Sequence, residues 1–338
     1  MRISVSGTRG KTTTVNILHD VLRSRGLKVL SKTTGEKAII RDDAEREISE
    51  RPRSVLYENL DLIKSNYDAI IIENQAITPY TMKAFNMMVK PDVIVITNVR
   101  LDHTEFLGES REEIAKSFCS SFVKSAKTVI SGEERQKMDE ILRKGAEKIG
   151  ANYIKAEKYD IPGSEAIGIA EAFLHHFLGE KMDFDERKNL LKRLDDIFSA
   201  RRRGDLFWYN GAKINDPDSA EIVLNYLRRK YGMDIAISAN LRGDRRDRTA
   251  VFSIFFRRLS KLDWIRRIFV SGPGSGSVAR FIGEKSVKVK EDPSSAHEII
   301  DFATREGLML VLLVNRRTKM ADILIEELSK GWESSRGT

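Results

Sequence analysis

The sequence predicts a two-domain α/β protein in which each domain contains a mostly parallel β-sheet. In the first half of the chain, short β-branched runs alternate with longer amphipathic stretches, a pattern typical of helices that pack over a parallel sheet. A second alternation of the same kind begins after the arginine run at residues 201–203. The length of 338 residues also exceeds the usual size of a single core, so we expect two domains.

Short apolar or β-branched runs in the first half are predicted to be strands. They cover residues 2–5, 28–30, 68–73, 93–97, 128–130 and 153–155. Residues 165–178 and 185–198 then predict two helices separated by Gly179, without a strand signal. We expect this pair of helices to close the first domain.

The second domain is predicted to begin with a hairpin-like pair of strands within residues 206–214, around Asn210-Gly211. Further strands are predicted at residues 235–238, 268–271, 287–289 and 309–314. We place the boundary near Arg203-Gly204, where a basic, glycine-containing stretch follows the helical pair. The predicted domains are therefore residues 1–203 and 204–338.

Composition narrows the class of protein. With 41% hydrophobic and 32% charged residues, the chain is too apolar to be disordered. Its net charge of +8 suits phosphate-bearing partners, and we favour nucleotides over nucleic acid. The single cysteine, Cys119, excludes an internal disulfide framework, and its neighbours suggest a buried helix position. Without a leader or a membrane-length apolar run, the sequence predicts a cytoplasmic location.

The strongest local motif lies between the first predicted strand and the first amphipathic helix. Its residues are Gly7, Thr8, Arg9, Gly10, Lys11, Thr12 and Thr13. The two glycines let successive backbone N–H groups point at phosphate oxygens, and the following helix adds its positive end. We expect Lys11 to reach the β- and γ-phosphates and Thr12 to offer its hydroxyl to Mg²⁺. The motif is shorter than the standard phosphate loop, so a plain glycine-rich turn is the alternative.

Polar residues follow two other predicted strands, at the edge where α/β sheets bind ligands. Glu73 ends the buried run at residues 68–73 and is a candidate metal-binding or water-holding carboxylate. Asn98, Asp102 and His103 follow the run at residues 93–97. The alternatives are a solvated or capping glutamate and a histidine hydrogen-bonded at a helix start.

A charged loop follows the predicted strand at residues 235–238. Residues 240–248 read Asn-Leu-Arg-Gly-Asp-Arg-Arg-Asp-Arg, and their arginines are candidates for holding a transferring phosphoryl group. A solvated loop with local ion pairs explains the same pattern.

Together these motifs resemble the Mur ligase superfamily and, within it, the poly-γ-glutamate synthases of the CapB/PgsB type. The resemblance is carried by residues 6–13, 32–35, 96–103, 215–219 and 240–249, with Glu73 and Gly108. It extends over nearly the whole chain. It implies a P-loop ATPase domain like the Mur ligase central domain, followed by a smaller Rossmann-like C-terminal domain.

The resemblance also implies an ATP-dependent acid–amino-acid ligase that releases ADP and phosphate. Such an enzyme converts a carboxylate into an acyl phosphate, which an amine attacks to form an amide, here in γ-glutamyl ligation. The implied catalytic residues are Lys11, Glu73, His103 and Arg242. The implied Mg²⁺ ligands are Thr12, Glu73 and His103. Beyond the loop, the implied ATP contacts are Asn215 near the adenine and Arg242 with Asp244 on the nucleotide.

The sequence departs from family patterns in three ways. It opens on the phosphate-loop domain, so we expect a small amino-acid or γ-glutamyl substrate rather than a UDP-linked precursor. It also opens without the membrane segment typical of the polyglutamate synthase, so we expect any surface tethering to need a membrane-bound partner subunit. A homo-oligomer is compatible with the sequence. Many Mur ligases carry a carbamylated lysine beyond the Asp-His pair. Here Lys116 is one position out of register and Ser117 takes its place, so we do not assign that role.

Two other functions would use the same features. An ATP-dependent switch or assembly factor would keep the phosphate loop but form no amide. Nucleic-acid binding through the arginine clusters would give a steeply salt-dependent affinity.

Overall fold

A computed structural model of the chain describes residues 1–34, 38–42, 45–48, 55–244, 246–315 and 318–330. Two compact units divide the chain, Met1–Leu194 and Asp195–Thr338. The domain boundary near Arg203-Gly204 stays a prediction. Two residues of the predicted motifs, Gly35 and Arg245, lie outside the described residues.

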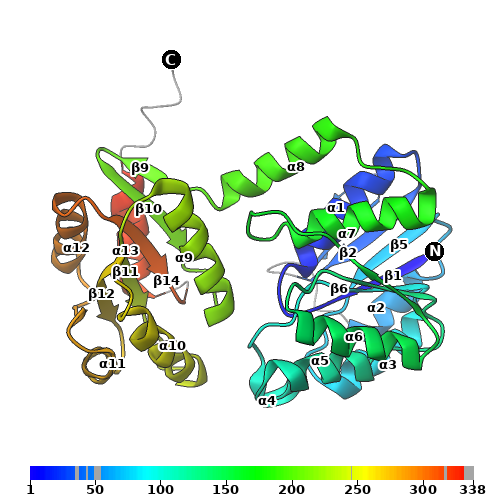
Figure 1. Ribbon diagram of the computed structural model, residues 1–338, viewed down its shortest axis with the longest axis horizontal. Helices are drawn as coiled ribbons and strands as arrows, with labels where there is room; N and C mark the ends of the chain where they lie inside the picture. The colour runs from blue at the N-terminus through cyan, green and yellow to red at the C-terminus, as the bar shows by residue number, and fades with distance from the viewer. Residues whose placement is uncertain (35–37, 43–44, 49–54, 245, 316–317, 331–338) are drawn as a thin grey trace. The chain divides into compact units, whose positions relative to one another are not determined.

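The first unit is built on an eight-stranded sheet with the order β4-β3-β2-β5-β1-β6-β7-β8 (Figure 1). Its strands are β1 (Arg2–Ser6), β2 (Val29–Thr33), β3 (Ala38–Arg41), β4 (Glu45–Ile48), β5 (Ala69–Glu73), β6 (Val93–Ile96), β7 (Thr128–Ser131) and β8 (Asn152–Lys155). All predicted strands are present and pair in parallel. The antiparallel extension β2-β3-β4 was not predicted, because β4 reads Glu-Arg-Glu-Ile and carries little apolar signal.

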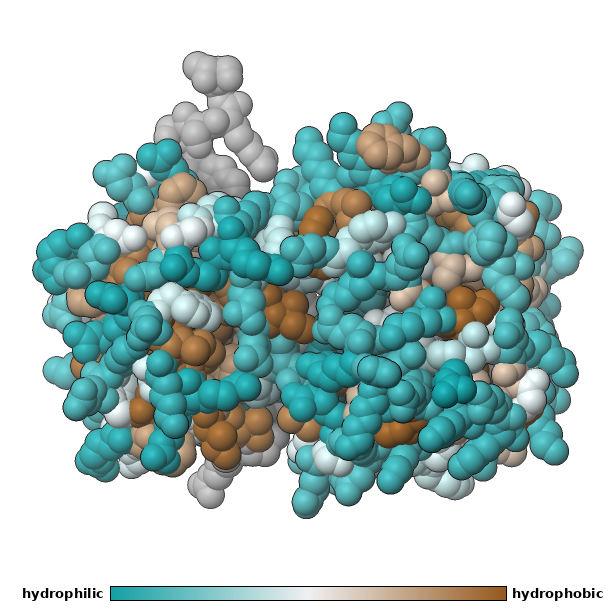
Figure 2. All heavy atoms as spheres, viewed as in Figure 1, coloured by the Kyte–Doolittle hydropathy of each residue, from teal (hydrophilic) through white to brown (hydrophobic). Residues whose placement is uncertain are grey.

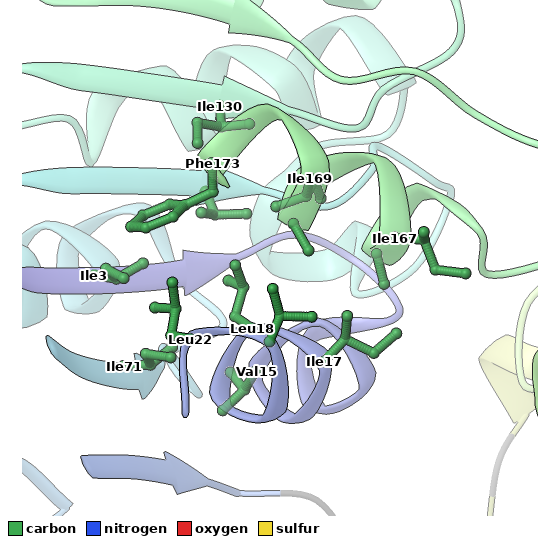
Figure 3. Packing of buried hydrophobic residues seen from close by; sticks show 14 of the residues in the cluster. Ile3, Val15, Ile17, Leu18, Leu22, Ile71, Ile130, Ile167, Ile169 and Phe173 are labelled. Atoms are coloured by element: carbon green, nitrogen blue, oxygen red, sulfur yellow. The ribbon is translucent and has the colours of Figure 1, made fainter. Parts of the chain in front are cut away.

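Helices cover both faces of this sheet. They are α1 (Lys11–Ser24), α2 (Val55–Leu62), α3 (Pro79–Val89), α4 (Thr104–Leu107), α5 (Arg111–Ser120), α6 (Gln136–Lys148), α7 (Glu165–Phe173), the π-helix η1 (Leu174–Leu178) and α8 (Phe184–Ile197). On one face, Leu18 of α1 and Phe173 of α7 pack with Ile3 of β1 (Figure 3). On the other, Phe118 of α5 and Leu142 of α6 share a core with strand β6.

Strand register positions the polar residues of the first sheet. Val5 lies opposite Glu73, so Glu73 lies beside the start of the phosphate loop. Ser6 lies opposite Ile96, which brings the segment after β6 alongside Gly7. Because parallel strands end at the same edge of a sheet, three chain segments far apart in sequence meet at this point.

The second unit contains a six-stranded sheet with the order β13-β12-β11-β14-β10-β9. Its strands are β9 (Arg201–Arg203), β10 (Leu206–Gly211), β11 (Ile235–Asn240), β12 (Ile265–Ser271), β13 (Ser286–Lys288) and β14 (Met309–Leu313). The predicted hairpin around Asn210-Gly211 is wrong. Residues 206–211 form one strand, and its antiparallel partner is the arginine run, with Gly204 at positive φ between them.

Helices also flank this second sheet. They are α9 (Pro217–Tyr231), α10 (Arg246–Leu259), α11 (Ser275–Ile282), α12 (Pro293–Arg305) and α13 (Lys319–Ser329). One core joins α9, α10 and α11 to the sheet, with Phe252 and Phe256 at its centre. The other joins α12 and α13 to it, with Trp208 buried among them. The predicted fold class, two mostly parallel α/β sheets, is confirmed.

On the face drawn in Figure 2 most residues are hydrophilic, and the hydrophobic residues occur in separate groups. Exposed apolar side chains include Tyr80, Phe184 and Ile254. Among the described residues, no helix is both long enough and apolar enough to cross a bilayer. Cys119 lies on α5 as predicted, but it is half-buried rather than buried, with its thiol against the Ile141 carbonyl.

His19 is a buried histidine on helix α1. Its side chain is inaccessible, and neither ring nitrogen has a hydrogen-bond partner in the described part of the chain. Burial lowers the pKa of His19 to about 4, and the nearby charge of Arg41 acts in the same direction. The native state therefore keeps His19 neutral at pH values where the unfolded chain protonates it.

We predict that the free energy of unfolding falls as the pH drops from about 6.5 to about 4. In this window the unfolded state binds a proton that native His19 does not bind, which favours unfolding by up to about 3 kcal/mol. Urea titrations across this window should show the fall in the wild type and its loss in His19→Leu. His176→Gln alters an exposed histidine of the same unit and should retain the fall. An unchanged pH dependence in His19→Leu would contradict the assignment.

Candidate functional site

The predicted phosphate loop joins β1 to α1. Gly7 has φ 128° and Gly10 has φ 80°, so both adopt left-handed backbone conformations that favour glycine. Gly7 also packs closely against Thr97. A Cβ added to Gly7 would lie only 2.0 Å from Thr97 Oγ1, so a larger residue does not fit. The tight turn directs the chain into the N-terminus of α1, as a phosphate-binding loop requires.

Lys11 begins helix α1 and folds back over the loop. Its Nζ donates to the Gly7 carbonyl at 2.9 Å. Burial lowers the pKa of Lys11, and the negative charge of Glu73 opposes this shift. A partly desolvated ammonium at a helix N-terminus is suited to binding an anion such as a polyphosphate.

Thr12 and Glu73 meet at the carboxyl edge of the sheet. The Thr12 hydroxyl donates to Glu73 Oε2 at 2.9 Å, and the backbone N–H of Thr34 donates to the same oxygen at 2.9 Å. Glu73 is 5% exposed. A hydroxyl and a carboxylate placed together provide the hard oxygen ligands that Mg²⁺ prefers.

The side chain of Asn98 binds backbone groups of the phosphate loop. Its Oδ1 accepts from the Arg9 N–H at 3.1 Å, and its Nδ2 donates to the Arg9 carbonyl at 3.0 Å. The Thr8 N–H donates to the Asn98 carbonyl at 3.1 Å, and the Thr8 hydroxyl accepts from the Arg100 N–H at 3.0 Å. The segment after β6 therefore fixes the middle of the loop.

Asp102 and His103 form the outer part of the same edge. Asp102 Oδ2 forms an ion pair with Arg9 Nη2 at 2.6 Å. His103 has φ 51°, its side chain is 42% exposed, and its Nε2 lies 3.5 Å from Asp102 Oδ2. Within the described residues, no three His, Cys, Asp or Glu side chains are arranged to hold a metal ion. The structure thus brings Thr12 to Glu73, while His103 contacts Asp102.

Lys116 and Ser117, the two residues considered for the carbamylated-lysine position, lie on helix α5. Lys116 is exposed on α5. The hydroxyl of Ser117 donates to the Leu107 carbonyl at 2.6 Å.

In the second unit, the predicted residues lie at two places along the sheet edge. Asn215 precedes the Asp216 cap of α9, and its Oδ1 accepts from Arg248 at 3.1 Å. The same Arg248 nitrogen also donates to Asn315 Oδ1 at 3.1 Å. Arg242 makes a two-pronged ion pair with Asp244, at 2.9 and 2.6 Å. The predicted residues Arg242 and Asp244 therefore bind each other.

Sequence reasoning missed several residues of these two edges. They are Glu133, Glu165 and Asn315, together with Thr34 and Arg100, which lie within motifs that carried the resemblance but were given no role. Glu133 is buried and accepts from the Val99 N–H at 2.5 Å, and burial raises its pKa. Asn315 has φ 57°, a strained left-handed conformation next to the sheet edge. The strained backbone of Asn315 gives no signal in the sequence. Arg248, in contrast, lies within the charged stretch at residues 240–248 that the sequence analysis singled out.

Comparison with family models assigns both parts of the chain. Residues 5–168 match the Mur ligase middle domain, and residues 197–331 match the C-terminal domain of poly-gamma-glutamate synthase CapB. Together the two family models match most of the chain, so the chain resembles the Mur ligase superfamily along most of its length. The predicted resemblance is confirmed, and the second match supports its poly-γ-glutamate synthase branch.

Two curated relatives agree with this resemblance. The chain is 27% identical over 288 residues to PGA synthase CapB of Bacillus subtilis (strain 168), a match that covers 75% of this chain and 70% of that protein. It is 25% identical over 286 residues to capsule biosynthesis protein CapB of Bacillus anthracis, covering 75% of this chain and 60% of that protein.

Solved structures of Mur ligase relatives share the fold. The bifunctional folylpolyglutamate synthase/dihydrofolate synthase of Yersinia pestis, complexed with AMPPNP and Mn ion, matches with a TM-score of 0.63 at 17% identity, covering 96% of this chain and 88% of that one. MurF of Acinetobacter baumannii matches with a TM-score of 0.65 at 16% identity, covering 97% and 76%.

We predict that Gly7→Ala damages the loop more than Gly10→Ala. Both changes strain a left-handed backbone, by about 1–2 kcal/mol. At Gly7 the new Cβ also collides with Thr97, raising the total to about 2–4 kcal/mol, whereas at Gly10 its nearest neighbour is at 3.5 Å. Urea unfolding of both variants measures the difference, and equal losses would show that the Thr97 contact is unimportant.

Proposed function

We propose that this chain is an ATP-dependent amide ligase that joins a γ-glutamyl or other amino-acid carboxylate to an amine and releases ADP and phosphate. The observation that carries the proposal is the phosphate loop with Lys11 across it and Glu73 on Thr12, in a chain that resembles the Mur ligase superfamily. The two curated CapB relatives support γ-glutamyl chemistry, because one of them is named a PGA synthase.

We propose ATP as the nucleotide because solved structures of similar fold contain ATP analogues or ADP. Solved structures of the same fold hold AMPPNP with Mn ion, in one case with L-glutamate, or ADP. In this chain the loop N–H groups and Lys11 offer donors and positive charge to the β- and γ-phosphates. Removing one such electrostatic contact costs about 10²-fold in rate or more in typical enzymes.

A divalent ion fits the hydroxyl and carboxylate oxygens of Thr12 and Glu73, and we propose that it is Mg²⁺. When bound, it would neutralise charge on the phosphoryl oxygens. We propose His103 as a further ligand, which would turn from its contact with Asp102 toward the ion.

The reaction transfers the γ-phosphoryl group and then forms an amide. A carboxylate oxygen of the substrate attacks the γ-phosphorus, and ADP leaves with the electrons of the broken bond. The amine then attacks the acyl carbon, phosphate leaves, and the amine nitrogen gives up a proton. In this scheme Lys11 and the loop N–H groups bind and orient the phosphates.

Asn215, Arg242 and Asp244 are the proposed nucleotide contacts of the second unit, with Arg242 also proposed to be catalytic. Arg248 holds the amide oxygen of Asn215, which supports a fixed side-chain position there. The cytoplasmic location, a membrane-bound partner subunit and a homo-oligomer remain expectations from the sequence.

We predict that ADP and phosphate are released from ATP only when glutamate or another amino-acid carboxylate is present together with an amine acceptor. Lys11→Ala should lower this rate by about 10²-fold or more, because the phosphoryl charge loses its fixed cation. Lys137→Ala removes an exposed lysine paired with Glu112 and serves as the control.

Coupled assays for ADP and for AMP separate the possible chemistries. Release of AMP and pyrophosphate would reject the acyl-phosphate route. ADP release that ignores every amino acid tested, together with ATP-dependent binding to another protein, would favour a switch.

We predict that Thr12→Ala raises the Mg²⁺ concentration needed for half-maximal activity by about tenfold, because it removes one of two neighbouring oxygen ligands. Thr12→Ser retains the hydroxyl and should behave like the wild type. The measurement is a Mg²⁺ titration after chelation with EDTA. Equal titrations for the two variants would remove Thr12 from the metal site.

A further inference from the structure

Glu165 lies beneath the phosphate loop, although it is far from the loop in sequence. It is the first residue of α7 and is 3% exposed. Its Oε1 accepts from Asn98 Nδ2 at 2.8 Å and from Arg100 Nη2 at 3.3 Å. A Cβ added to Gly10 would lie 3.5 Å from the same oxygen, so the loop packs directly on the carboxylate.

These contacts link Glu165 to the peptide groups that face a bound phosphate. Asn98 Nδ2 is shared between Glu165 and the Arg9 carbonyl, while Asn98 Oδ1 accepts from the Arg9 N–H. Arg100, the second partner of Glu165, donates its backbone N–H to the Thr8 hydroxyl oxygen. Fixing Asn98 and Arg100 therefore fixes two consecutive residues of the loop.

We propose that Glu165 is a positioning residue of the nucleotide site: through Asn98 and Arg100 it holds the phosphate loop in the conformation that binds the β- and γ-phosphates of ATP. This inference rests on the proposed ATP-dependent function. Glu165 touches no phosphate itself. Its effect is to keep the Thr8 and Arg9 peptides oriented before the nucleotide arrives.

A general helix-stabilising role does not account for these contacts. An acidic residue in the first turn is favourable through the helix dipole, and an exposed glutamate would supply that. Here Oε1 is turned toward two side chains from another segment. Oε2 is buried and has no partner within the described residues, a cost that a helix terminus alone does not require. The carboxylate is placed for the loop.

Calorimetric titration of the full chain with a non-hydrolysable ATP analogue and Mg²⁺ tests the proposal. Glu165→Ala should weaken analogue binding by about tenfold or more, because a buried hydrogen bond to a charged group is lost. Glu165→Gln keeps a carbonyl oxygen for Asn98 and should stay within about threefold of the wild type. Glu171→Gln is the matched control. It lies on the same helix and pairs with Tyr159 and Arg187, and its affinity should be unchanged.

A double-mutant cycle separates positioning from simple stabilisation. If Glu165 acts mainly through Asn98, the double variant of Glu165→Ala and Asn98→Ala should bind only slightly more weakly than Asn98→Ala alone. The proposal would be overturned if the loss of affinity in the double variant equalled the product of the two single-variant losses. An unchanged affinity in Glu165→Ala would overturn it as well. Thermal melts identify any variant that fails to fold, and Glu165→Gln then carries the comparison with Asn98→Ala.

The same titration distinguishes this inference from the proposed function. A wild-type chain that does not bind the ATP analogue would overturn both. A wild-type chain that binds it and releases ADP with amino acids, combined with normal binding by Glu165→Ala, would overturn only the role of Glu165.

Discussion

The close contact between Gly7 and Thr97 is the constraint on which the rest of the candidate site depends. Gly7 adopts a φ that glycine tolerates and leaves no room for a Cβ against Thr97. This contact brings the end of β1 against the end of β6. Thr97 then donates to the Arg9 carbonyl at 2.6 Å, and Asn98 holds both polar groups of the Arg9 peptide. The phosphate loop is thus shaped by a neighbouring strand as well as by its own glycines.

The charged side chains around this loop are partly desolvated and are held in place by hydrogen bonds and ion pairs. Lys11 is held over Gly7 with a pKa lowered by burial, Arg9 pairs with Asp102, and Glu73 accepts from Thr12 and Thr34. Preorganised groups of this kind need little rearrangement when a charged ligand binds, which is the usual source of electrostatic stabilisation in enzymes. A ligase that stabilises phosphoryl and tetrahedral oxyanions would use such an arrangement.

Both units follow one structural rule. Each carries its polar residues at the carboxyl ends of parallel strands, Glu73 and Asn98 in the first and Asn240 and Asn315 in the second. The Asn315 side-chain amide donates to the Asn240 carbonyl at 2.9 Å, which joins the ends of these two strands. Because parallel strands end at the same edge of a sheet, motifs that follow such strands in the sequence lie close to one another at that edge.

The sequence alone determined the alternation of strands and helices, the phosphate loop and the family. Those features are local: β-branched runs, glycines at a turn and a lysine at a helix start can be read from consecutive residues. The hairpin around Asn210-Gly211 was wrong because the partner of β10 is the arginine run, whose side chains carry no strand signal. Likewise, β4 pairs through its backbone while its side chains are mostly charged.

Only the tertiary structure showed that Glu165 reaches Asn98 and that Glu133 holds the Val99 N–H. Glu165 read as an ordinary acidic residue at a helix start, since nothing next to it in sequence reveals a partner 67 positions away. Such contacts depend on which strand ends lie side by side. Strand order is set by packing of the whole sheet, and that information is not contained in any local stretch of the chain.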